Sequence, residues 1–180
     1  MSKIMSAYMN PAIDLNISKI RWAAFLCIFT AAAVALPYIC HQFGIAGMVF
    51  LPIHFAVMIA AAVMGTRGGI IVALASPVFS FALSGMPPAY SLLPMTIELM
   101  IYATVISLLS NKLRAPLIVS LALAMIAGRF ASIMMVSAIL ESTPIAIQMR
   151  NIFIVAIPGI AIQLALVPPI AAKIRKFLAN

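Results

Sequence analysis

Residues 45–84 read IAGMVFLPIHFAVMIAAAVMGTRGGIIVALASPVFSFALS, and Arg67 is the one charged residue in this stretch. Two apolar runs of about 17–25 residues separated by a short polar connection are typical of two membrane-spanning helices. The same alternation continues on both sides of the stretch. Polar residues divide the chain into six apolar segments, at 19–39, 45–65, 69–84, 93–110, 115–140 and 151–172.

The composition of the whole chain excludes an ordinary soluble domain. Of the 180 residues, 66% are hydrophobic and 8% are charged, and the mean hydropathy is +1.22. A soluble domain carries about 25% charged residues. We therefore expect an all-α integral membrane protein with six transmembrane helices. Residues 1–18 would form a cytoplasmic segment, residues 19–172 the membrane domain, and residues 173–180 a basic cytoplasmic tail.

The basic residues predict how the helices are oriented. If the six segments alternate in direction, nine of the eleven Lys and Arg residues share one side: Lys3, Lys19, Arg21, Arg67, Lys112, Arg114, Lys173, Arg175 and Lys176. Lys and Arg are enriched in cytoplasmic loops, so both termini are expected to be cytoplasmic. Anionic lipid headgroups then account for the net charge of +8, and nucleic acid is not expected as a partner.

Few polar side chains fall inside the apolar segments, and each is costly to place there. Glu98 is expected about 6 Å below the outer end of its segment and His54 somewhat deeper. Arg129 is expected near mid-membrane, where an ionised Arg costs about 2.5–3.5 kcal/mol unless it faces protein or water. Tyr102 and Met95 lie about one turn on either side of Glu98, on the same helix face.

Two interpretations of this cluster remain open. In the first, the helix dipole stabilises Glu98, Arg129 is its salt-bridge partner, and His54 is a satisfied core residue, so that the cluster only holds the bundle together. In the second, the cluster lines a ligand pocket open to the outside. Met86 and Tyr90 would cover such a pocket, because the proline-rich segment 85–90 is expected to be non-helical and to fold back over the bundle.

The outer rim of the membrane domain carries a further set of polar residues. Asn151 lies there together with Glu141, Gln148 and Arg150. These side chains are either ordinary interface residues or part of the boundary of the pocket. We count Asn151 among the candidate ligand contacts.

Other chemistry is sparse. The chain has three acidic residues in all and no nucleotide-binding or metal-binding motif, so no metal, cofactor or ATP hydrolysis is expected. Catalysis is not expected either. A single polar pocket without a second gate favours a binding subunit that needs a partner to complete transport.

A stripe of small residues offers a place for such a partner. Ala23, Cys27, Ala31 and Ala35 recur every four residues along the first segment. Small residues at this spacing allow a second helix to approach closely. Packing inside the chain's own bundle is an equally consistent interpretation of the stripe.

Several short motifs are distributed from about residue 20 to residue 172. They are Leu51-Pro52-Ile53-His54, Gly65, Gly69, Pro77, Gly85-Met86-Pro87-Pro88, Met95, Glu98-Leu99, Gly128-Arg129, Pro158-Gly159 and Gln163. Together these motifs resemble the substrate-binding S component of energy-coupling factor (ECF) transporters. The small-residue stripe resembles the alanine motif by which these subunits dock, with Cys27 at a position where alanine is usual.

The resemblance implies a six-helix subunit of the bacterial cytoplasmic membrane that captures a vitamin-like small molecule from outside. It implies docking onto a transmembrane coupling protein driven by two ATPase subunits, with toppling of the subunit to release its cargo inward. It also implies ligand contacts from Glu98, Arg129 and His54. Two other classes stay open: a small membrane enzyme or accessory subunit in which these three residues are catalytic, and a channel or scaffold in which they are structural.

Overall fold

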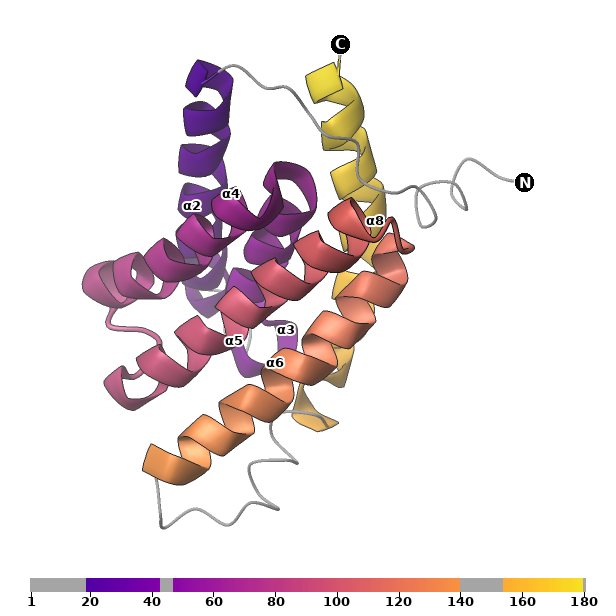
Figure 1. Ribbon diagram of the computed structural model, residues 1–180. Coiled ribbons are helices and arrows are strands. Elements are labelled where there is room, and N and C mark those ends of the chain that lie inside the picture. The colour runs from indigo at the N-terminus through magenta and orange to yellow at the C-terminus, as the bar shows by residue number, and fades with distance from the viewer. Residues whose placement is uncertain (1–18, 43–46, 140–153, 180) are drawn as a thin grey trace.

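The structure is a computed structural model, and it describes residues 19–42, 47–139 and 154–179. All regular structure in these ranges is helical (Figure 1). The α-helices are α2 (Lys19–Gln42), α3 (Gly47–Phe50), α4 (Pro52–Ser84), α5 (Ala89–Ser107), α6 (Leu117–Ile139) and α8 (Ile157–Ala179). A π-helical segment, Leu108–Lys112, extends α5.

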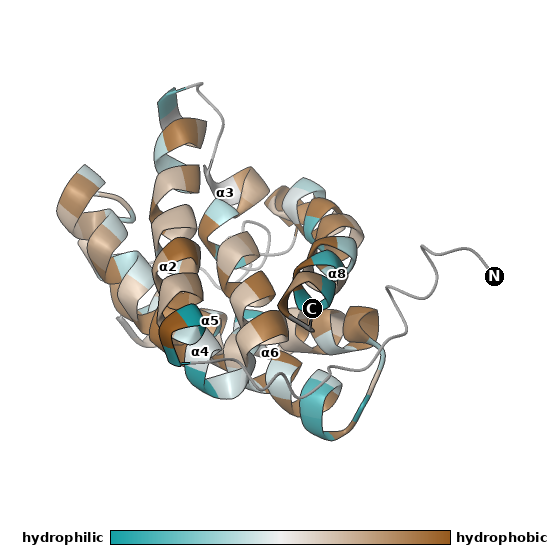
Figure 2. Cartoon of the chain, turned by 90° about the horizontal axis from the view of Figure 1, so that it is seen from above, coloured by the Kyte–Doolittle hydropathy of each residue, from teal (hydrophilic) through white to brown (hydrophobic). Residues whose placement is uncertain are grey.

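The helices have the length and composition of membrane spans. Five stretches of the described chain are long and apolar enough to cross a bilayer. Large apolar side chains point outward, among them Leu83, Met134 and Phe177, each exposed by more than 70%. Figure 2 shows that apolar residues cover the helices on most sides and that hydrophilic residues are confined to short patches. Helices that are apolar all round belong in lipid, so the expected all-α, multi-pass membrane class is confirmed.

Gly65 interrupts α4 and divides it into two helical segments. Its backbone, at φ 75° and ψ −169°, is outside the helical region, and only glycine adopts such a conformation without strain. Gly69 then lets the two segments pack closely, because a Cβ there would lie 2.9 Å from the Ala61 Cα and 3.0 Å from the Ala103 Cβ. The polar connection predicted at residues 66–68 is thus helical, and the break is confined to Gly65.

The first segment of α4 is the centre of the core. Its residues from Ala56 to Val63 are all buried, and α4 packs against α2, α5 and α8. Two side chains of α8 hydrogen-bond to backbone carbonyls at the two ends of this segment. Gln163 Nε2 donates to Leu51 O at 3.1 Å, and Arg175 Nε donates to Ala62 O at 3.0 Å. The first segment of α4 and α8 therefore run in the same direction.

The basic end of the chain is helical, and one of its cations is buried. Helix α8 continues to Ala179, and the Arg175 side chain is buried although Lys173 and Lys176 are exposed. The break at Gly65 explains this burial. A helix that ends leaves the carbonyls of its last turn without intrahelical partners, and the guanidinium of Arg175 supplies two donors to the carbonyl of Ala62.

The start of α5 also differs from the prediction. The Pro87-Pro88 pair was expected to keep residues 85–90 out of any helix, but α5 begins at Ala89 directly after Pro88. Proline is compatible with a helix amino terminus because the first N–H groups of a helix have no partner within it. Glu98 consequently lies nine residues into its helix, about 13 Å at 1.5 Å per residue.

Candidate functional site

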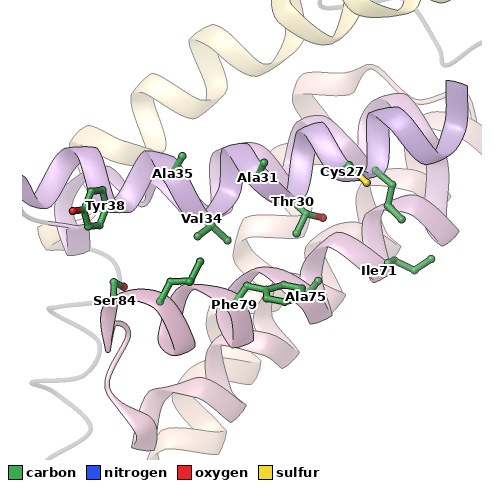
Figure 3. Close-up of a pocket in the computed structure, with 12 residues that line it drawn as sticks. Cys27, Thr30, Ala31, Val34, Ala35, Tyr38, Ile71, Ala75, Phe79 and Ser84 are labelled. Carbon is green, nitrogen blue, oxygen red and sulfur yellow. The ribbon is translucent and has the colours of Figure 1, made fainter.

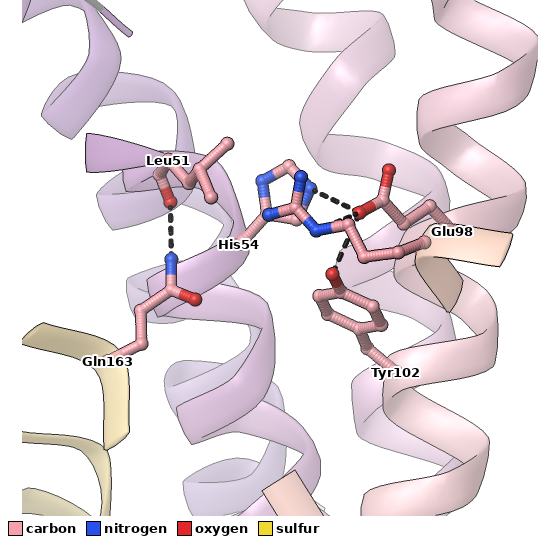
Figure 4. A network of polar contacts seen from close by, with 6 residues as sticks. Leu51, His54, Glu98, Tyr102 and Gln163 are labelled. Atoms are coloured by element: carbon pink, nitrogen blue, oxygen red, sulfur yellow. Dashed lines mark hydrogen bonds and ion pairs between the residues drawn. The ribbon is translucent and has the colours of Figure 1, made fainter. Parts of the chain in front are cut away.

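Glu98 is the centre of a buried polar cluster formed by three helices (Figure 4). Its Oε1 accepts a hydrogen bond from the Tyr102 hydroxyl at 2.7 Å. The same oxygen lies 3.4 Å from His54 Nε2 and 3.3 Å from Arg129 Nε. These four residues, which we call the quartet, are each no more than 5% exposed. The structure therefore brings together four of the residues that the sequence marked as a site.

Each helix positions its contribution by ordinary rules. Glu98 and Tyr102 are four residues apart on α5, the spacing at which helical side chains meet. His54 is in the first turn of α4, and its ring lies with its centroid 5.5 Å from that of Tyr102. Arg129 reaches the cluster from α6. The Glu98 carboxylate and the Arg129 guanidinium neutralise each other's charge, so neither group is left unpaired in lipid.

Gly128 allows α6 to come close enough to α5 for this contact. A Cβ at position 128 would overlap the ring of Tyr102 and would lie 3.1 Å from the backbone oxygen of Glu98. The adjacent Gly128-Arg129 pair thus has a physical basis. Gly128 permits the close approach of α6 to α5, and this approach brings the Arg129 side chain within reach of the Glu98 carboxylate.

Gln163 is a candidate site residue that the predicted site set lacked. Its side chain is fully buried, and its amide nitrogen donates to Leu51 O beside the first turn of α4 (Figure 4). Its Oε1 has no hydrogen-bond partner among the described residues, and the same is true of His54 Nδ1. An amide inside an apolar segment is the signal in the sequence by which this position could have been found.

The remaining predicted contacts do not join the quartet. Met95 is half-buried and packs against the apolar core. Met86 and Tyr90 are 39% and 58% exposed, so the expectation that they fold inward over the bundle is wrong. Asn151 lies outside the described residues. The quartet, rather than a loop above it, is the organised part of the site.

The small-residue stripe faces away from the quartet. Ala23, Cys27, Ala31 and Ala35 are all exposed, which rules out the alternative that they pack inside the bundle. Three of them line a groove of about 900 Å³ between α2 and the second segment of α4 (Figure 3). The groove is lined by Leu26, Cys27, Thr30, Ala31, Val34, Ala35, Tyr38, Ile71, Ala75, Phe79, Leu83 and Ser84.

A second polar contact joins α4 to α5 just beyond the break at Gly65. Thr66 Oγ1 donates to Ser107 Oγ at 2.9 Å, and Asn111 Nδ2 donates to the same oxygen at 3.2 Å. These uncharged groups satisfy one another. In the part of the chain that the structure describes, no group of three or more His, Cys, Asp or Glu residues is placed to hold a metal ion.

Comparison with known proteins finds no matching family model, no similar curated protein and no similar solved structure. The quartet combines a carboxylate, a guanidinium, an imidazole and a phenol in a buried setting. Such a set suits hydrogen-bonded recognition of a small polar molecule.

Proposed function

We propose that this chain is the substrate-binding subunit of an ECF-type importer in a bacterial cytoplasmic membrane. It would capture a vitamin or related micronutrient from outside. A transmembrane coupling protein and two ATPase subunits would then drive delivery to the cytoplasm. A buried ion pair adds little stability to a helix bundle, because apolar residues of similar volume could replace it at no cost in stability. The buried quartet therefore indicates a function, and it is the observation that supports this proposal.

The distribution of charge supports an outward-facing site. Lys19 begins α2, Arg67 follows the break in α4, and Lys112 and Arg114 lie between α5 and α6, all of them exposed. The beginning of α2, the break in α4 and the end of α8 lie toward the same end of the bundle (Figure 1). By the positive-inside rule this end is cytoplasmic. The quartet is reached from the opposite end, where the first segment of α4 begins.

The length of α4 supports six crossings. Its 33 residues would extend about 50 Å as one straight helix, well beyond a hydrocarbon core of about 30 Å. The break at Gly65 turns it into two segments that cross the membrane in opposite directions. Together with α2, α5, α6 and α8, these two segments give six spans with both termini on the cytoplasmic side.

The separation of the two surfaces supports a binding subunit that works with a partner. The quartet is built from α4, α5 and α6, whereas the exposed stripe and its groove belong to α2 and the second segment of α4. Capture and docking would thus use different faces. A scaffold would need neither a buried ionic cluster nor an exposed small-residue face.

A bound small molecule tests the proposal most directly. We expect the detergent-purified chain, expressed in a host that imports micronutrients, to retain a water-soluble compound in about equimolar amount. Mass spectrometry of the denatured protein would detect this compound. A protein that carries only lipid and detergent, and that retains no member of a panel of water-soluble vitamins, would contradict a binding function.

The topology makes a separate prediction. A cysteine introduced at Ala89, at the start of α5, should react with a membrane-impermeant thiol reagent in intact cells. One introduced at Asn111, in the π-helical segment, should react only after the cells are opened. The comparison requires a background in which Cys27 and Cys40 are replaced by serine. Labelling of position 111 from outside would reverse the orientation and place the quartet on the wrong side.

A further inference from the structure

Two buried hydrogen-bond acceptors at the start of α4 are unused within the chain. Gln163 Oε1 and His54 Nδ1 have no partner among the described residues, although Gln163 is fully buried and His54 is 2% exposed. Leu51, which binds the Gln163 amide, directly precedes α4, and His54 is in the first turn. Both atoms therefore lie at the same end of the helix, on the side from which the quartet is reached.

Chemistry fixes the Gln163 oxygen as an acceptor, and it makes His54 Nδ1 an acceptor in the neutral imidazole. The Leu51 carbonyl can only accept, so the amide nitrogen of Gln163 must face it and the oxygen must point elsewhere. The Nε2 atom of His54 lies 3.4 Å from the carboxylate of Glu98, which favours the proton on that nitrogen. In a neutral imidazole the other nitrogen is then an acceptor. A buried acceptor without a partner is costly, so these two positions call for donors.

We infer that the ligand presents two hydrogen-bond donors to His54 Nδ1 and Gln163 Oε1, either from one –NH2 group or from a pair of neighbouring hydroxyl groups. This inference rests on the proposed function and specifies its substrate class. Glu98 and Arg129 balance one another's charge within 3.3 Å, so the recognised group is an uncharged one. A carboxylate in its place would bring lone pairs against both acceptors and would be rejected.

Matched probes test the donor requirement. The purified full chain is incubated with nicotinamide or nicotinate, which differ by –NH2 against a carboxylate oxygen, and with pyridoxine or 4-deoxypyridoxine, which differ by one hydroxyl. Affinity-selection mass spectrometry measures retention. We expect the donor-rich member of at least one pair to bind at least about tenfold more tightly than its partner. The pair that discriminates shows whether the donors come from an amino group or from hydroxyls.

Two substitutions of His54 separate ligand recognition from packing. His54→Asn keeps a polar terminal group near the position of Nδ1 and gives up the contact with Glu98. His54→Gln reaches the position of Nε2, so it preserves the contact with Glu98 and removes the acceptor at Nδ1. We expect His54→Gln to lose retention of the preferred probe by at least about tenfold, and His54→Asn to retain more. Gln163→Met should lose retention as well.

The reverse order, with His54→Gln binding as well as the natural chain, would show that His54 acts only through Glu98 and would overturn the inference. Equal retention of both members of every probe pair would do the same, as would unchanged binding in all three variants, which would mean that water satisfies the acceptors. In each of these cases the chain still binds a small molecule and the proposed function stands. Failure of the natural chain to retain any probe or any copurified compound would remove both.

Discussion

Replacing Arg129 by Ala is expected to abolish retention of the copurified small molecule or to weaken it by about 2–5 kcal/mol, the usual cost of losing a charged partner in a desolvated site. Arg129 is 4% exposed and lies 3.3 Å from the carboxylate of Glu98. Its removal takes away the guanidinium donors and leaves the buried carboxylate with His54 and Tyr102 alone. Equilibrium binding with the purified variant would measure the loss.

The same substitution also strains the fold, so a second variant is needed to separate binding from stability. Removing one partner of a buried ion pair typically costs about 3–5 kcal/mol of stability, whereas replacing both charges by uncharged side chains of similar volume is often neutral. Arg129→Met combined with Glu98→Gln should therefore unfold near the temperature of the natural chain and still fail to bind. Glu98→Gln alone should have the smaller effect on affinity. A double variant that binds normally would show that the pair is only a structural salt bridge.

The quartet could be predicted from the sequence because placing ionised and polar side chains in lipid has a high free-energy cost. An Arg at mid-membrane must find a carboxylate or water, and Glu98 is the one acidic residue within the six apolar segments. Depth along each segment then places Glu98, His54 and Arg129 in the outer half of the bundle, between about 6 Å from its outer end and mid-membrane. The prediction needed no knowledge of helix packing, only of the energy that isolated charges would cost.

The contacts of Gln163 and Arg175 could not be predicted from the cost of polar groups in lipid. Both donate to backbone carbonyls, and those carbonyls are available only because of local backbone features at Leu51 and Gly65. Leu51 is in the left-handed region at φ 51°, an uncommon conformation for leucine that no pattern in the sequence announces. Arg175 stands among lysines, and its neighbours in the sequence give no sign that its side chain is buried.

The proline-rich connection differs from its prediction for another reason. The Pro87-Pro88 pair predicts a non-helical segment, yet the same residues are compatible with the start of a helix. The earlier start of α5 moves Tyr90 onto an exposed helix face and carries Glu98 deeper into the bundle. Local propensity defined where a helix could not continue, but it did not define where the next one begins.

Composition could not predict which way the small-residue stripe faces. Because the stripe is exposed, substitutions in it are expected to have a large effect on uptake. Ala31→Leu and Ala35→Leu should nearly eliminate uptake of the copurified molecule in cells that also express the coupling protein and ATPases. A leucine at either position projects into the groove between α2 and the second segment of α4, where a partner helix needs small residues to approach. The affinity of the isolated subunit should change little, because the quartet is on other helices.

Ala127→Leu provides the matched control, since Ala127 is another exposed alanine, on α6, and does not line the groove. It adds the same volume to a lipid-facing surface and should leave both uptake and binding intact. Copurification of the coupling protein with each variant would show directly whether docking is lost. Uptake that survives Ala31→Leu would mean that the partner does not dock on the small-residue stripe. Uptake that continues when the ATPase subunits are deleted would mean that the chain moves its cargo without a motor, and would refute its assignment as an importer subunit.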